Sequence, residues 1–430
     1  MTERQIIPIP HPLHAAVRVP GSKSLTNRAL LIAALANGTT RLTNALFSDD
    51  SRYFAKALQT LGFDIQLDDV NHEMIVTGLG GKIPAQKAEL FIGNAGTAAR
   101  FLTAFLTLGN GEYILDGDQR MRERPIGDLV ESLAQLGATV QPSSFGLHPS
   151  RICPPVKIVA SGLAGGRTRI AGNISSQFLS ALLMAAPYAK SPIEIELTAE
   201  LNSKPYIDMT IAVMKDFGVE IERDEYIRFA IHPSSYFPLS FYSIECDASA
   251  ASYFFAAPAI CGGTVRVENI SRKSRQGDLA FLDILRRMGC AVAETDHCIR
   301  VTGPAELRGV DADMRDIPDT AQTLAAIAPF ASSPTRIRGI ASARLKETDR
   351  LHATCAELAR LGVKVEERKD GMTIDPCQIF RPATIRTHND HRMAMAFSLI
   401  GLRAHGVVIE NPSCVSKTFP NFFEVLEALR

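Results

Sequence analysis

Two series of helices alternate along the chain. The first series is apolar on every side, and each of its helices has a polar beginning; these helices start near Ser22, Gly96, Ser175, Asp247, Asp319 and Asp390. The second series has one polar face and ends on a glycine before a strand-like segment; the glycines are Gly62, Gly137, Gly218, Gly289 and Gly362, and a sixth such helix ends the chain. Both series recur about every 70–80 residues, which predicts six similar structural repeats.

The repeats predict an α/β fold around buried helices. A helix that is apolar on every side has to be buried, and short alternating stretches such as 73–79 and 299–307 predict strands around it. A chain of 430 residues exceeds one ordinary core. We therefore expect two domains of three repeats each, with the break near 237–249, between the third and the fourth repeat.

Composition narrows the functional class. The chain has 46 Lys and Arg residues against 46 Asp and Glu residues, which argues against a nucleic-acid-binding protein that works through bulk positive charge. The eight cysteines form no CxxC pair and are typical of reduced thiols in a cytoplasmic protein. We find no apolar signal segment at the beginning and no apolar run long enough to span a bilayer. These features predict a cytoplasmic location.

The starts of the helices carry unusual charge. Lys23 and Arg28 lie at the first turns of a helix, where the helix dipole disfavours a cation by roughly 0.3–1 kcal/mol. This turn is either solvated and basic or it binds an anion. Cations recur at the starts of other elements, and the full set is Lys23, Arg28, Arg100, Arg124, Lys346, Arg350, Arg392 and Lys417. If the repeats bring these starts together, their charge requires bound phosphate or carboxylate groups.

Two carboxylates among these cations are candidates for an acid and a base. Asp319 stands at a helix start, where N-capping is the structural alternative, and Glu347 stands in a charged run that is otherwise typical of a solvated surface. His388, Asp390 and His391 are the only tight cluster of metal-ligand residue types, with no HExxH pattern and no nearby cysteine. The chain has no Walker, GxGxxG or GxSxG motif either. We expect a metal-free and cofactor-free enzyme that acts on two phosphorylated or carboxylated small molecules.

Motifs spread over the whole chain resemble one family. They include PGSKSLTNRAL at 20–30, GNAGTAAR at 93–100, SSQFLSALLM at 175–184, LKETDR at 345–350 and NDHRMAM at 389–395. In these motifs the sequence resembles the family of 5-enolpyruvylshikimate-3-phosphate (EPSP) synthase, or 3-phosphoshikimate 1-carboxyvinyltransferase. The resemblance implies a two-domain inside-out α/β barrel with three repeats per domain. One domain would be 21–240, and the other would join an N-terminal strand within 1–20 to 241–430, with the active site in the cleft between them.

The resemblance also implies the reaction. The enzyme would transfer the enolpyruvyl group of phosphoenolpyruvate to the 5-hydroxyl of shikimate 3-phosphate and release inorganic phosphate by addition–elimination, on the shikimate pathway to chorismate and the aromatic amino acids. It would be a cytoplasmic monomer whose domains close on the substrates, with no nucleic-acid or membrane partner. Glu347 would protonate the methylene carbon of phosphoenolpyruvate, Asp319 would be the base toward the hydroxyl, and Lys23 would help the phosphate to depart. The division of these roles stays open.

The substrate contacts are carried over by motif. Shikimate 3-phosphate would contact Lys23, Ser24, Arg28, Ser175, Ser176, Gln177, Ser203, Tyr206, Asp319, Ser342 and Lys346. Phosphoenolpyruvate would contact Lys23, Gly96, Arg124, Gln177, Glu347, Arg350, Arg392 and Lys417. The chain departs from the family pattern at Ser342, where the family has asparagine, and at Phe101, where many members have proline. The contact at 342 would therefore come from serine instead of asparagine, and the response to glyphosate does not follow from the sequence.

Two alternatives compete with this interpretation. UDP-N-acetylglucosamine enolpyruvyl transferase shares the fold and the phosphoenolpyruvate chemistry, but that family has a reactive cysteine in the stretch equivalent to 116–125, where this chain has none; the nearest in sequence is Cys153. A non-catalytic anion-binding scaffold would gain nothing from Asp319 and Glu347 among the cations.

Overall fold

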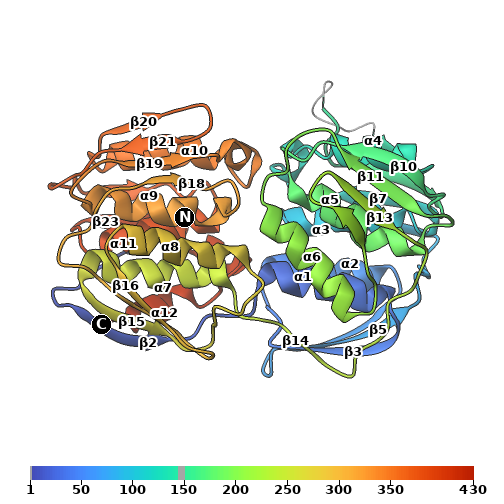
Figure 1. Ribbon diagram of the computed structural model, residues 1–430, viewed down its shortest axis with the longest axis horizontal. Coiled ribbons are helices and arrows are strands. Elements are labelled where there is room, and N and C mark those ends of the chain that lie inside the picture. The colour runs from blue at the N-terminus through green and yellow to red at the C-terminus, as the bar shows by residue number, and fades with distance from the viewer. Residues whose placement is uncertain (1, 144–150) are drawn as a thin grey trace. The chain divides into compact units, whose positions relative to one another are not determined.

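The chain forms two compact domains. The computed structural model describes residues 2–143 and 151–430. The N-terminal domain is Gly21–Glu245, and the C-terminal domain combines the residues up to Pro20 with Cys246–Arg430 (Figure 1). Each domain has a hydrophobic core of its own. Within the described residues, no helix is long and apolar enough to cross a membrane.

Three buried helices form the centre of the N-terminal domain. They are α1 (Lys23–Leu35), α3 (Gly96–Leu106) and α5 (Ser176–Ala185). In α1 every residue from Leu25 to Leu35 is buried, as the all-apolar sequence predicts. The amphipathic helices α2 (Asp49–Thr60), α4 (Gly127–Gln135) and α6 (Lys204–Asp216) each keep some residues exposed.

Three four-stranded sheets complete the N-terminal domain. Their strand orders are β14-β3-β5-β4, β6-β7-β9-β8 and β10-β11-β13-β12. The strands are β3 (Asn37–Thr43), β4 (Asp64–Asp68), β5 (Glu73–Leu79), β6 (Lys87–Phe91), β7 (Asn110–Asp116), β8 (Thr139–Pro142), β9 (Val156–Ser161), β10 (Gly166–Ile170), β11 (Ile193–Leu197), β12 (Glu222–Asp224), β13 (Arg228–Ile231) and β14 (Tyr242–Ser243). Each sheet has one parallel pair at its edge, and its other pairs are antiparallel.

The C-terminal domain repeats this plan. Its buried helices are α7 (Ala248–Cys261), α9 (Ala321–Ile327) and α11 (His391–Gly401), and its outer helices are α8 (Phe281–Arg287), α10 (Arg350–Arg360) and α12 (Phe422–Glu427). The sheet orders are β16-β17-β15-β2, β18-β19-β21-β20 and β1-β23-β22. The strands are β1 (Glu3–Gln5), β2 (Leu13–Val17), β15 (Gly263–Val267), β16 (Ala291–Glu294), β17 (Ile299–Thr302), β18 (Asp311–Asp313), β19 (Thr335–Arg338), β20 (Val365–Glu367), β21 (Met372–Ile374), β22 (Ala383–Ile385) and β23 (Val407–Glu410). Short 3₁₀ turns adjoin the helices, among them η2 (Ala186–Tyr188), η4 (Pro318–Thr320), η5 (Ala328–Phe330), η6 (Ala341–Leu345) and η7 (Pro412–Lys417). The predicted α/β fold of six repeats is confirmed.

The two domains exchange one strand each. In four repeats, the strand before the buried helix pairs in parallel with the strand after it, as β6 does with β7 around α3. In the first repeat, β2 precedes α1 but pairs with β15, the strand that follows α7. In the fourth repeat, β14 precedes α7 but pairs with β3, the strand that follows α1. The second crossing therefore lies at Glu245–Cys246 rather than near residue 240, because β14 completes a sheet of the N-terminal domain.

Gly78 in β5 lies against the end of the buried helix α1. A Cβ atom at this position would lie 2.1 Å from the carbonyl oxygen of Ala33 and 2.3 Å from that of Ala36. Both contacts are with backbone, which cannot rotate away as a flexible side chain can. Only glycine therefore lets the strand and the helix approach this closely.

We expect Gly78→Ala to lower the free energy of unfolding by about 1–3 kcal/mol or more, because the added methyl group has to push the strand off the helix. The control is Gly127→Ala at the start of α4, where the nearest heavy atom to an added Cβ is Ile152 Cβ at 3.8 Å; it should change the value by less than about 1 kcal/mol. Urea denaturation of the two variants measures both effects. Equal unfolding free energies would contradict the close approach.

Candidate active site

Lys23 at the start of α1 is paired with a carboxylate from the start of α2. Its Nζ lies 3.7 Å from Oδ2 of the buried Asp50. Asp50 stands in the first turn of α2, where the helix dipole favours an anion. The pairing offsets the cost of a cation at the start of α1. Asp50 was not among the predicted site residues, because an aspartate in the first helical turn is typical of an ordinary stabilised helix start.

Arg28 is buried inside the N-terminal domain and connects three helices. Its guanidinium donates four hydrogen bonds. The acceptors are Thr210 Oγ1 at 2.7 Å, the Ser24 carbonyl at 2.9 Å, the Tyr206 carbonyl at 3.1 Å and Ser180 Oγ at 3.3 Å. Burial lowers the pKa of Arg28 to about 10. The structure thus brings the predicted residues Ser24, Arg28 and Tyr206 together and adds Ser180 and Thr210, which the sequence did not single out.

Arg124 lies across the start of α3. Its Nη1 donates to Asn94 Oδ1 at 2.9 Å and to the Asn94 carbonyl at 3.3 Å. A Cβ atom on Gly96, the first residue of α3, would lie 2.5 Å from Arg124 Nη2, so glycine at 96 makes room for the guanidinium. Arg100 donates back to the Gly96 carbonyl at 3.1 Å and to the Pro125 carbonyl at 3.2 Å. Two guanidinium groups therefore lie at one helix start.

The starts of α5 and α6 supply hydroxyl and amide groups. Ser175 is the N-cap of α5 and its Oγ accepts from the Gln177 N–H, while Gln177 Nε2 donates to Thr97 Oγ1 in α3 at 3.2 Å. Ser176 is the buried first residue of α5. Ser203 precedes α6 in the left-handed region at φ 59°, and Tyr206 follows in the first turn of α6. These two helix starts therefore carry the residues that the sequence predicts for the shikimate side, and their role there stays a prediction.

Arg350 is the centre of the charged cluster in the C-terminal domain. Its Nε lies 2.7 Å from Asp390 Oδ2 and its Nη2 lies 3.3 Å from Asp390 Oδ1. Its Nη2 is also 2.7 Å from Glu347 Oε2, and its Nη1 is 3.1 Å from Asp319 Oδ1. Burial alone would lower the pKa of Arg350, but the carboxylates of Asp390, Glu347 and Asp319 outweigh it and raise that pKa above its ordinary value. The guanidinium therefore stays charged.

Two further cations complete this cluster. Arg392 Nη2 donates to Asp319 Oδ2 at 2.8 Å, and Lys417 Nζ lies 3.8 Å from Glu347 Oε1. The cluster therefore contains three cations, which are Arg350, Arg392 and Lys417, and three carboxylates, which are Asp319, Glu347 and Asp390. Nearly all of these groups are buried. The 3₁₀ turn η6 holds the predicted Ser342, which is buried, and Lys346 follows it. The structure thus brings the predicted acid and base onto one arginine.

Asp390 is the main residue of this cluster that the sequence did not predict. It is buried, it caps α11 by accepting from the Arg392 N–H at 2.9 Å, and it accepts both hydrogen bonds from the edge of Arg350. His391 Nδ1 lies 3.5 Å from its Oδ1, whereas His388 pairs with Glu357 at 3.6 Å. Within residues 2–143 and 151–430, no three His, Cys, Asp or Glu side chains are placed to hold a metal ion.

Comparison with solved structures defines the class. EPSP synthase from Acinetobacter baumannii superimposes with a TM-score of 0.82 at 25% sequence identity, covering 99% of this chain and 98% of that one. The enolpyruvyl transferase NikO from Streptomyces tendae shares the fold with a TM-score of 0.77 at 19% identity, covering 99% of this chain and 96% of that one. The fold is thus that of the enolpyruvyl transferases.

The sequence comparison gives the family. Residues 7–426 match the model of EPSP synthase (3-phosphoshikimate 1-carboxyvinyltransferase), and this chain belongs to that family. The 3-phosphoshikimate 1-carboxyvinyltransferase of Nostoc sp. PCC 7120 is 51% identical over 96% of each chain. The chloroplastic one of Brassica napus is 48% identical over 96% of this chain and 82% of its own length. The predicted family is confirmed.

We expect Asp390→Asn to lower the free energy of unfolding by about 3–5 kcal/mol, because it removes the charge opposite a buried guanidinium. Asparagine is also a good N-cap, so the cap of α11 is retained and the loss isolates the charge. The matched control is Asp311→Asn, which breaks an exposed pair with Arg338 and should cost less than about 1 kcal/mol. Urea denaturation measures both values, and equal losses would contradict the central role of Asp390.

Proposed function

We propose that this chain transfers the enolpyruvyl group of phosphoenolpyruvate to the 5-hydroxyl of shikimate 3-phosphate and releases inorganic phosphate. The activity is the one named for its 3-phosphoshikimate 1-carboxyvinyltransferase relatives at about half identity over nearly the whole chain. The structural observation that carries the proposal is the buried cluster in which Arg350 contacts both Asp319 and Glu347. Such a cluster holds a candidate base and a candidate acid beside cations that attract anionic substrates.

The pairing of the cluster suggests how substrates would activate it. Both carboxylate oxygens of Asp319 are engaged, one by Arg350 and the other by Arg392. An aspartate held in this way is a weak base. A phosphate or carboxylate group that draws Arg350 and Arg392 toward itself would leave Asp319 to accept the proton of the substrate hydroxyl. Arg350 and Arg392 would thus pair with Asp319 before substrate binds and with the substrate anion afterwards.

Glu347 is our proposed acid toward the methylene carbon of phosphoenolpyruvate. Protonation would make C2 cationic, and the hydroxyl oxygen of shikimate 3-phosphate would attack it. The tetrahedral intermediate would then lose phosphate from C2 and a proton from its methyl group, returned to the Glu347 carboxylate, which restores the methylene double bond. Lys23, Arg124 and Lys417 would bind the anionic groups, and the serine and glutamine groups at the starts of α5 and α6 would bind the shikimate side. We propose that both groups of residues take part in binding the two substrates.

The alternative substrate, UDP-N-acetylglucosamine, has less support. That chemistry uses a reactive cysteine, and the nearest candidate in sequence, Cys153, is buried. Burial raises the pKa of the Cys153 thiol, which disfavours the reactive thiolate. All eight cysteines are free thiols, which supports a reducing compartment such as the cytoplasm. The monomeric state stays a prediction.

The test of the proposed function is a phosphate-release assay. We expect release only when shikimate 3-phosphate and phosphoenolpyruvate are both present, and we expect the rate to survive EDTA, because the candidate acid, base and cations are side chains of the protein. Release with UDP-N-acetylglucosamine in place of shikimate 3-phosphate would support the alternative. Loss on chelation, restored by a divalent ion, would contradict the metal-free reaction.

We expect Glu347→Gln to lower turnover about 10²–10⁴-fold, the usual contribution of a positioned acid, because glutamine keeps the shape but has no proton to transfer. In deuterated water the parent should place deuterium on the methylene carbon, and the variant should lose this exchange in step with turnover. The matched control is Glu367→Gln, which alters a partly exposed pair with Arg344 and should turn over like the parent. If Glu347→Gln exchanges and turns over normally, Glu347 is only an ion-pair partner of Arg350.

A further inference from the structure

The third and the fifth repeat share a turn after their buried helix, but with different side chains in it. We call this turn, together with the later connection that crosses it, the corner. After α5 the chain reads APYAKSP at 186–192, and after α9 it reads APFASSP at 328–334. A later connection crosses each corner, and its backbone makes the same hydrogen bond in both: Ser234 N–H donates to the Pro187 carbonyl at 2.9 Å, and Cys377 N–H donates to the Pro329 carbonyl at 2.7 Å. The shared hydrogen bond establishes that the two corners are structurally equivalent.

In the N-terminal domain, two tyrosines close this corner. Tyr236 is buried, and its hydroxyl donates to the carbonyl of Met184 in the last turn of α5 at 3.0 Å. The hydroxyl of Tyr188 donates to the carbonyl of Leu35, the last residue of α1, and it accepts from the Tyr236 N–H at 3.3 Å. The last carbonyls of a helix have no partners within the helix and carry negative partial charge. Both phenol groups donate to such carbonyls, and the Leu35 carbonyl also accepts from the Gly81 N–H at 3.1 Å.

The C-terminal domain has no hydroxyl at the equivalent positions. Phe330 replaces Tyr188, and counting from the shared hydrogen bond places Ile379 opposite Tyr236. Ile379 is 84% exposed, whereas Tyr236 is 1% exposed. Phe330 instead stacks on Phe380, with the ring centres 4.9 Å apart and the planes at 28°. A bulky apolar side chain thus remains in solvent where the other domain buries a phenol.

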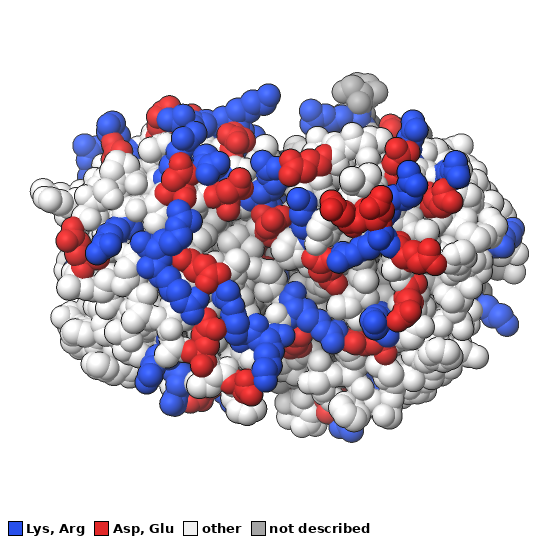
Figure 2. Space-filling model, viewed as in Figure 1, with Lys and Arg blue, Asp and Glu red and all other residues white. Residues whose placement is uncertain are grey.

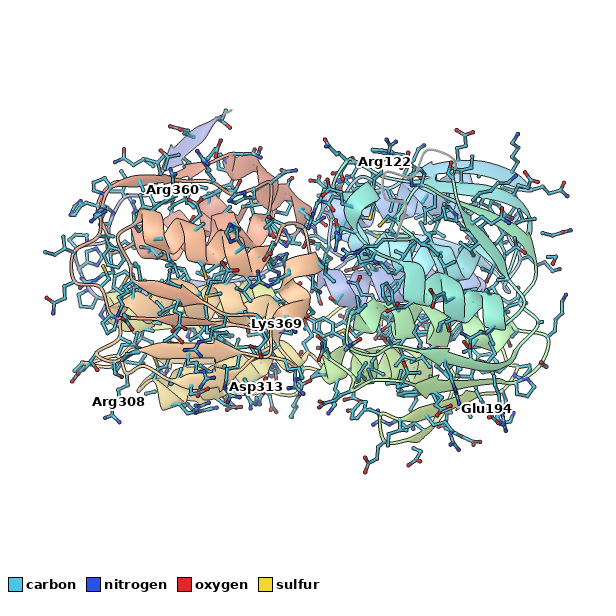
Figure 3. The ribbon with its side chains drawn as sticks, turned by 90° about the horizontal axis from the view of Figure 1, so that it is seen from above. Arg122, Glu194, Arg308, Asp313, Arg360 and Lys369 are labelled. Carbon is cyan, nitrogen blue, oxygen red and sulfur yellow. The ribbon has the colours of Figure 1, made fainter. Side chains whose placement is uncertain are left out.

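A cavity of about 760 Å³ lies at this corner. It is lined by the end of α7, the turn η5 after α9 and Arg403 just beyond α11. The loops at 304–307 and 376–380 also line it, except that the exposed Ile379 does not. Arg308, the residue after the first of these loops, is exposed and projects outward in Figure 3. The cavity is within the size range of small-molecule sites. Its lining combines the stacked rings of Phe330 and Phe380 with polar groups, and it includes Cys261 at the end of α7.

We propose that this cavity binds a small aromatic molecule that carries a hydroxyl group. The ring would pack against the Phe330–Phe380 pair, and the hydroxyl would donate to a helix-end carbonyl, as the phenol groups of Tyr188 and Tyr236 do in the other domain. The site would lie at the opposite end of α9 and α11 from Asp319 and Asp390. An 11-residue helix such as α11 spans on the order of 16 Å, so the occupant would not touch the charged cluster. The proposal does not depend on the enolpyruvyl transfer.

The test uses p-cresol, the side chain of tyrosine, and toluene, which lacks the hydroxyl. Ligand-observed NMR titration of the full chain should show saturable binding of p-cresol. Toluene should bind about threefold to tenfold more weakly, which is the usual contribution of one hydrogen bond. Equal affinities for the two molecules would overturn the role of the hydroxyl.

Variants locate the binding site. Ile379→Tyr combined with Phe330→Tyr restores both phenol groups of the equivalent corner and should abolish binding of p-cresol. Val70→Tyr is the control, since Val70 is 88% exposed in the other domain, and it should bind p-cresol like the parent. If the double variant is unstable, Phe330→Ala removes one ring of the stacked pair that lines the cavity and should weaken binding about tenfold. Unchanged binding in these variants would overturn the proposal.

A reciprocal variant tests the equivalence of the corners. Tyr236→Ala removes one phenol from the N-terminal domain and opens a space of the same chemistry. We expect p-cresol to raise the melting temperature of Tyr236→Ala by more than it raises that of the parent. Toluene should raise the melting temperature of the variant by less than p-cresol does. A p-cresol shift no larger than the parent's would overturn the inference that such a helix end binds a free phenol.

Discussion

A buried guanidinium needs partners for both its charge and its five N–H donors, and the candidate site is arranged around this requirement. Arg28 meets it with hydroxyl and carbonyl oxygens, so its charge is not neutralised and burial lowers its pKa to about 10. Arg350 meets it with three carboxylates, so its pKa is raised instead. The same side chain is thus stabilised in opposite ways in the two domains. Under the proposed function, Arg28 would keep its positive charge available to an anion, and the carboxylates around Arg350 would supply the acid and the base.

Much of the fold follows from periodicity. The all-apolar helices, the amphipathic helices and the glycines between them recur closely enough to predict six repeats, because burial on every side leaves a signature in each helix. The second domain crossing was harder to predict, since β14 has only two residues and pairs in parallel with a strand that lies some two hundred residues earlier. No local pattern reports such a pairing.

Charged side chains of both signs are interspersed over the face shown in Figure 2, which agrees with the zero net charge.

The sequence analysis singled out the cations of the candidate site but not most of the groups that hold those cations in place. Asp390 and Asp50 lie at helix starts, where aspartate is common for reasons of capping and dipole alone, so the sequence does not distinguish them. Thr210 and Ser180 carry no charge and read as ordinary helix residues, yet both accept hydrogen bonds from Arg28. Phe101, where the family often has proline, is fully buried, with the Arg28 guanidinium 5.4 Å from the centre of its ring. This departure therefore adjoins the cationic side of the site.

The exchange of β2 and β14 between the domains fixes an order of assembly during translation. The N-terminal domain obtains its last strand when β14, at Tyr242–Ser243, leaves the ribosome, so all of its sheets can form before the rest of the chain exists. By contrast, β2 is synthesised before the N-terminal domain, and its sheet partner β15 appears only after the whole of that domain. During translation, β2 therefore stays without its sheet partner until β15 of the C-terminal domain has been made.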